Sequence, residues 1–565
     1  MSLKNKLKTI NKKQLINFLI IMIIAILVRI YEFPNALKEV NSDEMMLAVN
    51  AKAIADTGKD INGISYPVYL LGFGGQSVLL LYIIVLCIKI FGYSLFVVRL
   101  PLLVISLISL VVFYDLIRRI SKNNTIALIG LGLLAISPWH ILQGMWALDC
   151  NILPHILLIA VYLLYIGVIK KSRLMLYLSM VFFALTLYSY GIAVYFTPIL
   201  LLALAIYLRH KKKISLPDLI ISIVIFSVLA MPIIIMFAIN ILKTNQSICF
   251  GNITIPYYES LSRTDDMLFF SSNILVQFFI NIGFTVLMIL GEFDGCTWNS
   301  SLIFGTAYHI TLVLVIVAII IKIKNKASHI HFGLSDVFSS TTDSIQETTN
   351  RDINLQDNFP RFLILSWLCT SIFTGIVINQ TNINRLNTIW YLIIMLATFA
   401  LYYFYNYLKK LDTNSENSSK KSKVYAISII SIFIILFTSY LIYFNCYYAN
   451  KVDMSICFSR GMYQSLNFTN TLPADTVKVD NLDNDGSIDI YIKSNNYFTD
   501  KTFDSLANQE ELAKALNSLS DDEALIINEK RNINIDNYDY VKFGEYYVVF
   551  KRWIVKRRAN FVPRF

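Results

Sequence analysis

The stretch KNKLKTINKKQLINFLIIMIIAILVRI, residues 4–30, decides the fold class. Lysines precede an apolar run from Leu15 to Ile30, a pattern typical of a signal peptide or of a first membrane helix. No small-residue cleavage site follows, because Arg29 and the bulky residues 31–33 end the run. We therefore predict an uncleaved membrane helix whose N-terminus lies in the cytoplasm.

The rest of the 565-residue chain has the composition of a polytopic membrane protein, with 56% hydrophobic and 15% charged residues. Soluble proteins carry about a quarter charged residues, so a water-soluble enzyme is excluded. The net charge is +11, and the basic residues lie in short clusters between apolar runs, where they determine the membrane topology. We therefore predict membrane lipids and no nucleic acid as partners. The cysteines form no CxxC pair and predict no zinc site.

The apolar runs predict about eleven transmembrane helices if every basic cluster between them is cytoplasmic. These lie at 15–31, 95–117, 125–139, 152–169, 174–190, 192–208, 216–238, 304–323, 362–379, 388–408 and 424–444. The stretches Val78–Phe91 and Ile274–Leu290 are shorter than the roughly twenty residues of a straight span. Counting either one alone as a crossing would move all later basic clusters outside. We therefore predict that both are helices in the outer interface.

Two domains are predicted. Residues 1–445 form a transmembrane domain with long outer loops at 32–94 and 240–303, and the polar segment 324–361 is an inner loop. Residues 446–565 are more polar and predict a small extracytoplasmic α/β domain without a phosphate loop. The simplest function of this tail is docking or acceptor binding.

The first outer loop carries a concentration of acidic residues, Glu39-Val-Asn-Ser-Asp43-Glu44. Ser42 or Asp43 is expected to cap a helix that ends near Thr57, whose free amide groups would stabilise an ionised carboxylate. Such a carboxylate suits a general base that takes a proton from an acceptor hydroxyl. An outward-facing enzyme lacks cytosolic nucleotides, so the donor we expect is a lipid-linked phosphate sugar. A purely structural cap remains the alternative.

Short motifs occur along the first 445 residues. They are Asp43-Glu44, Tyr66-Pro67-Val68-Tyr69, Val98-Arg99-Leu100-Pro101, Ser137-Pro138-Trp139-His140, Trp146-Ala-Leu-Asp149-Cys-Asn151, Leu187-Tyr-Ser-Tyr-Gly191 and Asn382-Ile-Asn-Arg385-Leu-Asn387. In these motifs the chain resembles family 39 glycosyltransferases of the GT-C superfamily, which include protein O-mannosyltransferases and lipid A aminoarabinose transferases. The resemblance covers most of residues 1–445.

The resemblance implies an inverting transferase that takes a hexosyl or pentosyl group from a polyprenyl-phosphate donor. Asp43 would be the catalytic base, Glu44 would help to hold a substrate, and Asp149 would shape the same cavity. The mannosyltransferase pattern has His-Pro-Pro where this chain has 72–76, and it has a basic residue where Met145 stands. These differences concern the donor-phosphate contacts and a protein acceptor.

The departing polyprenyl phosphate needs a cation, for which the sequence offers Arg385 first and then Arg99 and Lys52. Interfacial anchoring is the alternative for the two arginines. The remaining candidates would line the substrate cavity, although an aromatic belt would also explain Tyr190 and His140. They are Trp146, Asn151, Tyr190, His140 and Asn384, with Glu292, Asp294, Trp298 and Asn299 from the second loop.

We thus predict a multi-pass plasma-membrane glycosyltransferase of the cell envelope, with its active site outside. The acceptor is a glycan, a lipid or a protein. No cofactor and no metal is predicted to be required, although His140 near acids leaves a divalent metal possible. A transporter or flippase of lipid-linked glycans is the alternative from another class, and a non-catalytic scaffold is a third. The near absence of ionisable residues from span centres disfavours transport.

Overall fold

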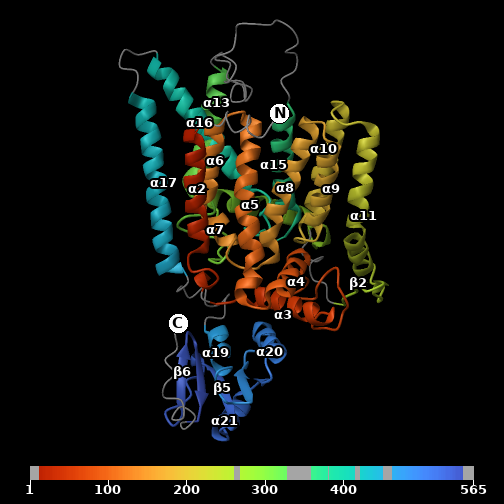
Figure 1. Cartoon of the computed structure of the whole chain (residues 1–565), viewed down its shortest axis with the longest axis vertical. Coiled ribbons are helices and arrows are strands. Elements are labelled where there is room, and N and C mark those ends of the chain that lie inside the picture. Colours follow the sequence, from red (N-terminus) through yellow and green to blue (C-terminus); the bar gives the residue numbers. More distant parts are fainter. Residues whose placement is uncertain are drawn as a thin grey trace. The chain divides into compact units, whose positions relative to one another are not determined.

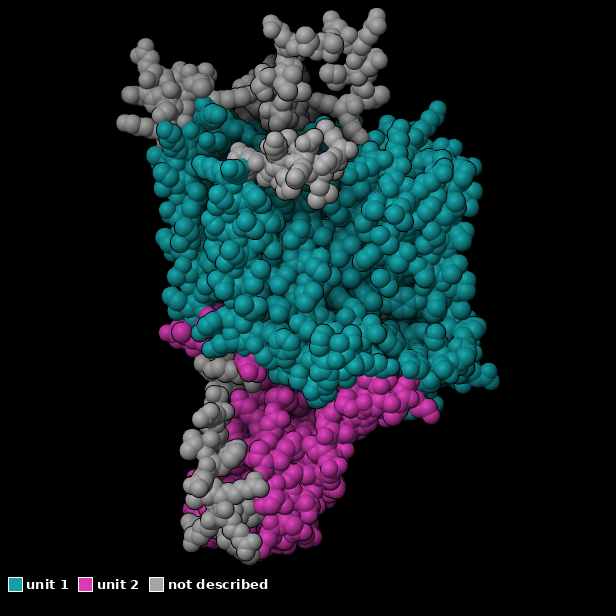
Figure 2. All heavy atoms as spheres, viewed as in Figure 1, with its two compact units in different colours: residues 1–34, 63–443 teal, residues 35–62, 444–565 magenta. Residues whose placement is uncertain are grey.

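The computed structural model describes residues 12–37, 39–259, 268–327, 358–379, 381–413, 420–448 and 461–551. The predicted lysine cluster at 4–8 and most of the predicted inner loop 324–361 lie outside these ranges. The chain forms two compact units, drawn in separate colours in Figure 2. Unit 1 comprises residues 1–34 and 63–443, and unit 2 comprises residues 35–62 and 444–565.

Unit 1 is a helical bundle whose long helices run side by side (Figure 1). Its helices are α2 (Lys12–Ile30), α4 (Leu79–Phe91), α5 (Leu95–Ser121), α6 (Asn124–Ile136), α7 (Pro138–Gln143), α8 (Asp149–Ile169), α9 (Arg173–Leu187), α10 (Ala193–His210), α11 (Leu216–Ile241), α12 (Ile274–Gly291), α13 (His309–Ala327), α15 (Phe359–Val377), α16 (Trp390–Thr413) and α17 (Lys420–Cys446), whose last residues fall in unit 2. The short helix η3 (Leu268–Phe270) and the hairpin strands β1 (Ile248–Phe250) and β2 (Ile253–Ile255) complete it.

Within the described ranges, nine helices are long and apolar enough to cross a membrane, and α4, α6, α9 and part of α13 are shorter apolar helices. Helix α8 lies at the centre, because 78% of its most apolar window is buried, and it packs against α5 and α9. Helix α12 is at the periphery, with 17% of its window buried. The polytopic helical architecture predicted from the sequence is confirmed.

Two details of the predicted spans differ from the structure. The predicted span 125–139 stops at Ile136, because Ser137 leaves the helical conformation. The Ser137 side chain accepts the His140 amide and so caps the separate helix α7, which begins at Pro138. Helix α12 has 18 residues, which lies within the range of about 17–25 residues for a transmembrane helix. The argument from shortness therefore does not hold for α12, and its interfacial placement rests on charge parity alone.

Unit 2 is built around a five-stranded sheet in the order β4-β3-β5-β7-β6. Its strands are β3 (Thr476–Asp480), β4 (Thr502–Leu506), β5 (Glu523–Asn528), β6 (Asp539–Phe543) and β7 (Tyr546–Phe550). Strand β3 pairs in parallel with β4 and β5, while β7 pairs antiparallel with β5 and β6. The helices are η1 (Asn35–Leu37), α3 (Ser42–Thr57), α19 (Met462–Thr469), α20 (Gly486–Phe498), α21 (Gln509–Asn517) and η5 (Glu529–Arg531). A small C-terminal α/β domain was predicted and is confirmed.

The first-loop helix α3 packs against α20 of the tail. Ser494 Oγ donates to Met45 Sδ at 3.0 Å, and the Tyr497 hydroxyl donates to Asp56 at 3.1 Å. The amide of Gly461 donates to Glu39 at 2.8 Å. Residues 35–62 therefore group with the tail, whereas the predicted division at 445/446 assigned them to the membrane domain.

Candidate functional site

Helix α3 presents the two first-loop acids in its first turn. The N-cap is Asn41, whose Oδ1 accepts the Asp43 amide at 2.8 Å, so the predicted caps Ser42 and Asp43 are wrong by one or two residues. Asp43 is half-buried, while Glu44 is fully buried. The helix ends at Gly58, which adopts the left-handed conformation that glycine tolerates best. A carboxylate in this first turn is stabilised in its ionised form.

Lys52 lies on the same helix and forms an ion pair with Asp56 one turn later. This pairing occupies the ammonium group that the sequence analysis offered to a donor phosphate. Asp43, Glu44 and Lys52 all belong to unit 2, so the predicted proximity of Asp43 and Asp149 stays a prediction.

Asp149 is the first residue of α8 in unit 1 and is almost fully buried. Its Oδ2 accepts the Ser77 amide at 3.1 Å, and its Oδ1 accepts the Cys150 amide at 2.8 Å. Asn151 donates to the Trp146 carbonyl at 3.3 Å. Trp146 is only 3% exposed, so stacking on a sugar would require this turn to open.

Arg385 lies in the turn between α15 and α16. Its amide donates to Asn382 Oδ1 at 2.8 Å, and its guanidinium donates to the Asn379 carbonyl. Asn384 donates to Asn299 Oδ1 at 2.7 Å, which ties the turn to the second loop. The side chain of Arg385 is half-buried, so the turn can present a cation to an anionic ligand.

Two second-loop carboxylates hold backbone around this turn. Asp294 Oδ2 accepts the Ile383 amide at 3.0 Å and Asn299 Nδ2 at 2.7 Å. Glu292 Oε2 accepts the Thr306 amide at 2.7 Å, its hydroxyl at 2.9 Å and the Ala307 amide at 2.9 Å. Burial raises the pKa of Glu292 above its ordinary value, against the effect of these hydrogen bonds. Asp294 and Glu292 therefore stabilise the conformation of the second loop and of this turn through these hydrogen bonds.

A hydrogen-bonded layer connects these segments of unit 1. Asn387 links α7 to the start of α8. The Thr306 carbonyl accepts the Trp139 amide and the Ser137 hydroxyl, both at 2.9 Å. We call the connected residues 76–77, 137–151, 292–308, 379 and 381–389 the polar layer.

His140 lies inside the bundle and away from any solvent-exposed surface. Arg29 donates to its Nδ1 at 2.6 Å, and its Nε2 lies 2.9 Å from Ser109 Oγ. Arg29 also donates to the carbonyls of Ala25 and Ala135, both at 3.0 Å, and is fully buried. Neighbouring helices enclose both side chains, so the burial of His140 disfavours the aromatic belt as its explanation.

The other two predicted residues are also enclosed. Arg99 is fully buried and donates to the Pro34 carbonyl, and Tyr190 is 8% exposed at the junction of α9 and α10. Neither lies at a surface that solvent reaches in this conformation.

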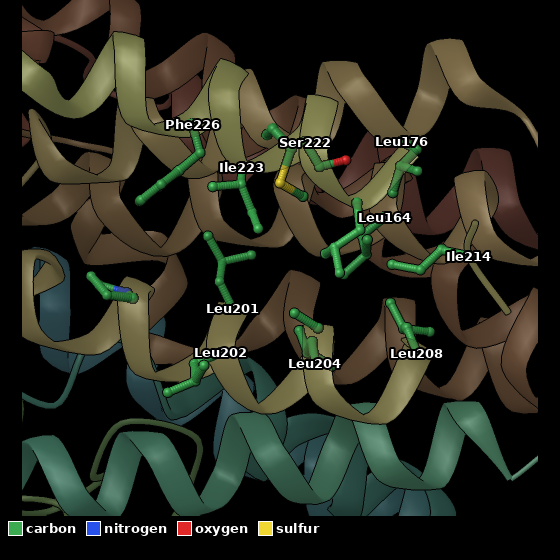
Figure 3. A pocket seen from close by; sticks show the side chains of 14 residues that line it. Leu164, Leu176, Leu201, Leu202, Leu204, Leu208, Ile214, Ser222, Ile223 and Phe226 are labelled. Carbon is green, nitrogen blue, oxygen red and sulfur yellow. The ribbon is translucent and has the colours of Figure 1, made fainter. Parts of the chain in front are cut away.

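One cavity of unit 1 is apolar. A space of about 220 Å³ lies between α8, α9, α10 and α11, lined by leucine, isoleucine and other apolar side chains with Ser222 as its one hydroxyl (Figure 3). It offers no charged group to a phosphate. Among the residues that the structure describes, no three His, Cys, Asp or Glu side chains are placed to hold a metal ion.

Comparison with known proteins gives two findings. A family model described as dolichyl-phosphate-mannose-protein mannosyltransferase matches residues 76–236. ArnT from Cupriavidus metallidurans bound to undecaprenyl phosphate is similar in structure, with a TM-score of 0.50 and 11% identity over 95% of this chain and 97% of that chain. The chain has a GT-C fold.

The GT-C resemblance predicted from the sequence is thereby confirmed. The apo form of the same ArnT gives a TM-score of 0.49 at 9% identity over 95% and 97% of the two chains. The Archaeoglobus fulgidus oligosaccharyltransferase tethered with an acceptor peptide gives 0.46 at 11% identity, covering 92% of this chain and 69% of its own. Among curated proteins, none matches the sequence. At 11% identity, the likeness to the lipid-bound ArnT structure shows the fold alone.

Sequence reasoning missed the function of Asn387, which was noted only as a neighbour of Arg385. Its partners are 237 to 248 residues away, so no local pattern identifies them. Gln143 was missed for the same reason. The one available signal was the unusual density of asparagine at 382–387.

Proposed function

We propose that the chain is a plasma-membrane glycosyltransferase that moves a hexosyl or pentosyl group from a polyprenyl-phosphate donor to an extracytoplasmic acceptor. The observation that carries this proposal is the GT-C fold over 95% of the chain, shared with an ArnT structure that holds undecaprenyl phosphate. The mannosyltransferase match at 76–236 supports the same chemistry. The acceptor is a glycan, a lipid or a protein of the cell envelope.

In the proposed reaction, Asp43 takes the proton of the acceptor hydroxyl as its oxygen attacks the anomeric carbon. The bond between that carbon and the phosphate oxygen breaks, and the polyprenyl phosphate leaves with the bonding electrons. A single displacement of this kind inverts the anomeric centre. Arg385 neutralises the charge that develops on the departing phosphate.

Three properties of Asp43 support its assignment as the base. It lies in the first turn of α3, where amide groups favour an ionised carboxylate. It is half-buried, which leaves part of the side chain accessible. Asn41 performs the capping of α3, so the helix does not depend on the Asp43 carboxylate for its cap. Glu44, the next residue, is fully buried and is proposed to help hold the acceptor or the donor, while Asp149 is proposed to shape the substrate cavity.

The test uses the purified full chain in lipid vesicles with a panel of undecaprenyl-phosphate hexoses and pentoses, in the presence of cell-envelope extract. The measurements are the release of undecaprenyl phosphate and the transfer of labelled sugar to the extract. Asp43→Asn should lower transfer by about 10²–10⁴-fold, the range for loss of general-base catalysis. Asp56→Asn is the matched control on α3 and should retain transfer. Equal rates for the Asp43→Asn variant and the unchanged chain would refute the proposed base.

A further inference from the structure

Asn387 is a fully buried amide at the centre of the polar layer. Its Oδ1 accepts Trp139 Nε1 at 3.1 Å and Gln143 Nε2 at 3.0 Å. Its Nδ2 donates to the Cys150 carbonyl at 3.0 Å. One side chain therefore joins the α15–α16 turn to both α7 and the first turn of α8.

The orientation of this amide is fixed by its partners. The Trp139 indole N–H can only donate, and the Cys150 carbonyl can only accept. A flipped Asn387 would place two donors against each other and two acceptors against each other. Gln143 must then present its NH2 group, and its Oε1 is buried without a partner. Asn387 is thus the acceptor for the NH2 group of Gln143.

The three asparagines around Arg385 have different partners. Asn382 accepts the Arg385 amide and caps the turn locally, while Asn384 ties the turn to Asn299 of the second loop. Asn387 ties it to the helix that begins with Asp149. Of these three asparagines, Asn387 is the one whose side-chain hydrogen bonds run from the turn of the proposed phosphate cation to the segment of the proposed cavity acid.

We propose that Asn387 is a positioning residue that fixes Arg385 relative to the Asp149 end of α8. This inference rests on the proposed function, in which Arg385 stabilises the departing phosphate. Because the stabilising charge must meet the leaving group in the transition state, a displaced turn should lower kcat more than it raises KM for the lipid donor.

The experiment is a double-mutant cycle between Asn387→Leu and Arg385→Gln, with kcat and KM measured for a polyprenyl-phosphate sugar. Asn387→Leu keeps the approximate volume but removes all three hydrogen bonds. We expect it to lower kcat by about 10–100-fold, since a misplacement of about 1 Å can cost a hundredfold. Arg385→Gln alone should lower kcat by about 10²–10³-fold. When Asn387→Leu is added to Arg385→Gln, kcat should fall further by less than about threefold.

The matched control is Asn240→Leu. Asn240 is also a buried amide of unit 1. Its side chain forms three hydrogen bonds with backbone groups, to the Met236 and Pro256 carbonyls and from the Tyr258 amide, and a weaker one to Met236 Sδ. The Asn240→Leu variant should lower thermal stability as much as Asn387→Leu does and leave kcat nearly unchanged. If Asn387→Leu does not fold, Trp139→Phe removes one of the three bonds and should show the same coupling to Arg385 on a smaller scale.

The inference is overturned if Asn387→Leu costs the same factor with and without Arg385, or if Arg385→Gln leaves transfer intact. Both outcomes can occur while Asp43→Asn abolishes transfer, in which case the proposed function stands. An inactive unchanged chain, or an active Asp43→Asn variant, would count against the proposed function itself.

Discussion

Asp43 of unit 2 and Asp149 of unit 1 occupy the same local position, the first turn of a helix, but they differ in what caps that helix. Helix α3 has a side-chain cap from Asn41. The N-cap residue of α8 is Leu148, which has no capping side chain, and the Asp149 carboxylate accepts the Cys150 amide in its place. The second Asp149 oxygen accepts the Ser77 amide, so both are engaged by backbone donors. Asp43 thus lies on a helix that another residue caps, whereas the Asp149 carboxylate itself accepts an amide at the start of its helix.

The largest expected difference between the two acids is in the rate of transfer. Asp43→Asn should lower kcat by about 10²–10⁴-fold with little change in thermal stability. Asp149→Ala should instead lose about 1–3 kcal/mol of stability, because the buried amides of Ser77 and Cys150 lose their acceptor. Rate and thermal unfolding of the purified variants in detergent measure both. A stable but inactive Asp149→Ala variant would move the catalytic assignment to unit 1.

The sequence was enough to predict what depends on local pattern. Apolar runs predicted the helical bundle, and the run Asp43-Glu44 predicted a helix that reaches Thr57, which the structure confirms. The partners of buried polar groups could not be predicted, because they are distant in sequence. The Arg29–His140 bond joins residues 111 apart, and the packing of α3 on α20 joins segments more than 400 apart. Periodicity reveals which face of a helix is apolar but not which helix covers it.

The second largest effect is expected from the cap itself. Asn41→Ala removes the acceptor of the Asp43 amide and should destabilise the start of α3 by about 1 kcal/mol. The Asp43 carboxylate would then be drawn toward the exposed amides, and transfer should fall by several-fold. Asn123→Ala, which removes the cap of α6, is the control for the loss of a cap as such. Equal rates for the two variants would show that capping and catalysis are independent on α3.

Glu292 extends the comparison to a third acid, whose Oε2 accepts three donors and whose Oε1 is buried without a partner. Burial raises its pKa, so the folded chain binds this proton more tightly than the unfolded chain does. Its contribution to stability is therefore greatest at pH values below the ordinary value of 4.5 and is lost as the pH rises through the raised pKa. Glu292→Gln cannot ionise and should become more stable relative to the unchanged chain as the pH rises. Thermal unfolding from pH 4 to pH 8 measures this, and parallel pH profiles would show that Glu292 is not titrating as expected.

The smallest effect is expected at Lys52, which the sequence offered as a phosphate ligand. Lys52 pairs with Asp56 at positions i and i+4 of α3, an arrangement worth about 0.3–0.5 kcal/mol when exposed. Asp56 has a second partner in the Tyr497 hydroxyl, so the carboxylate stays hydrogen-bonded when Lys52 is removed. Lys52→Met should therefore change kcat and KM by less than about twofold, because a pair of this strength is worth little. A tenfold rise in KM for the lipid donor, absent from Lys59→Met, would show instead that Lys52 leaves Asp56 to bind the phosphate, and would assign unit 2 a cation as well as a base.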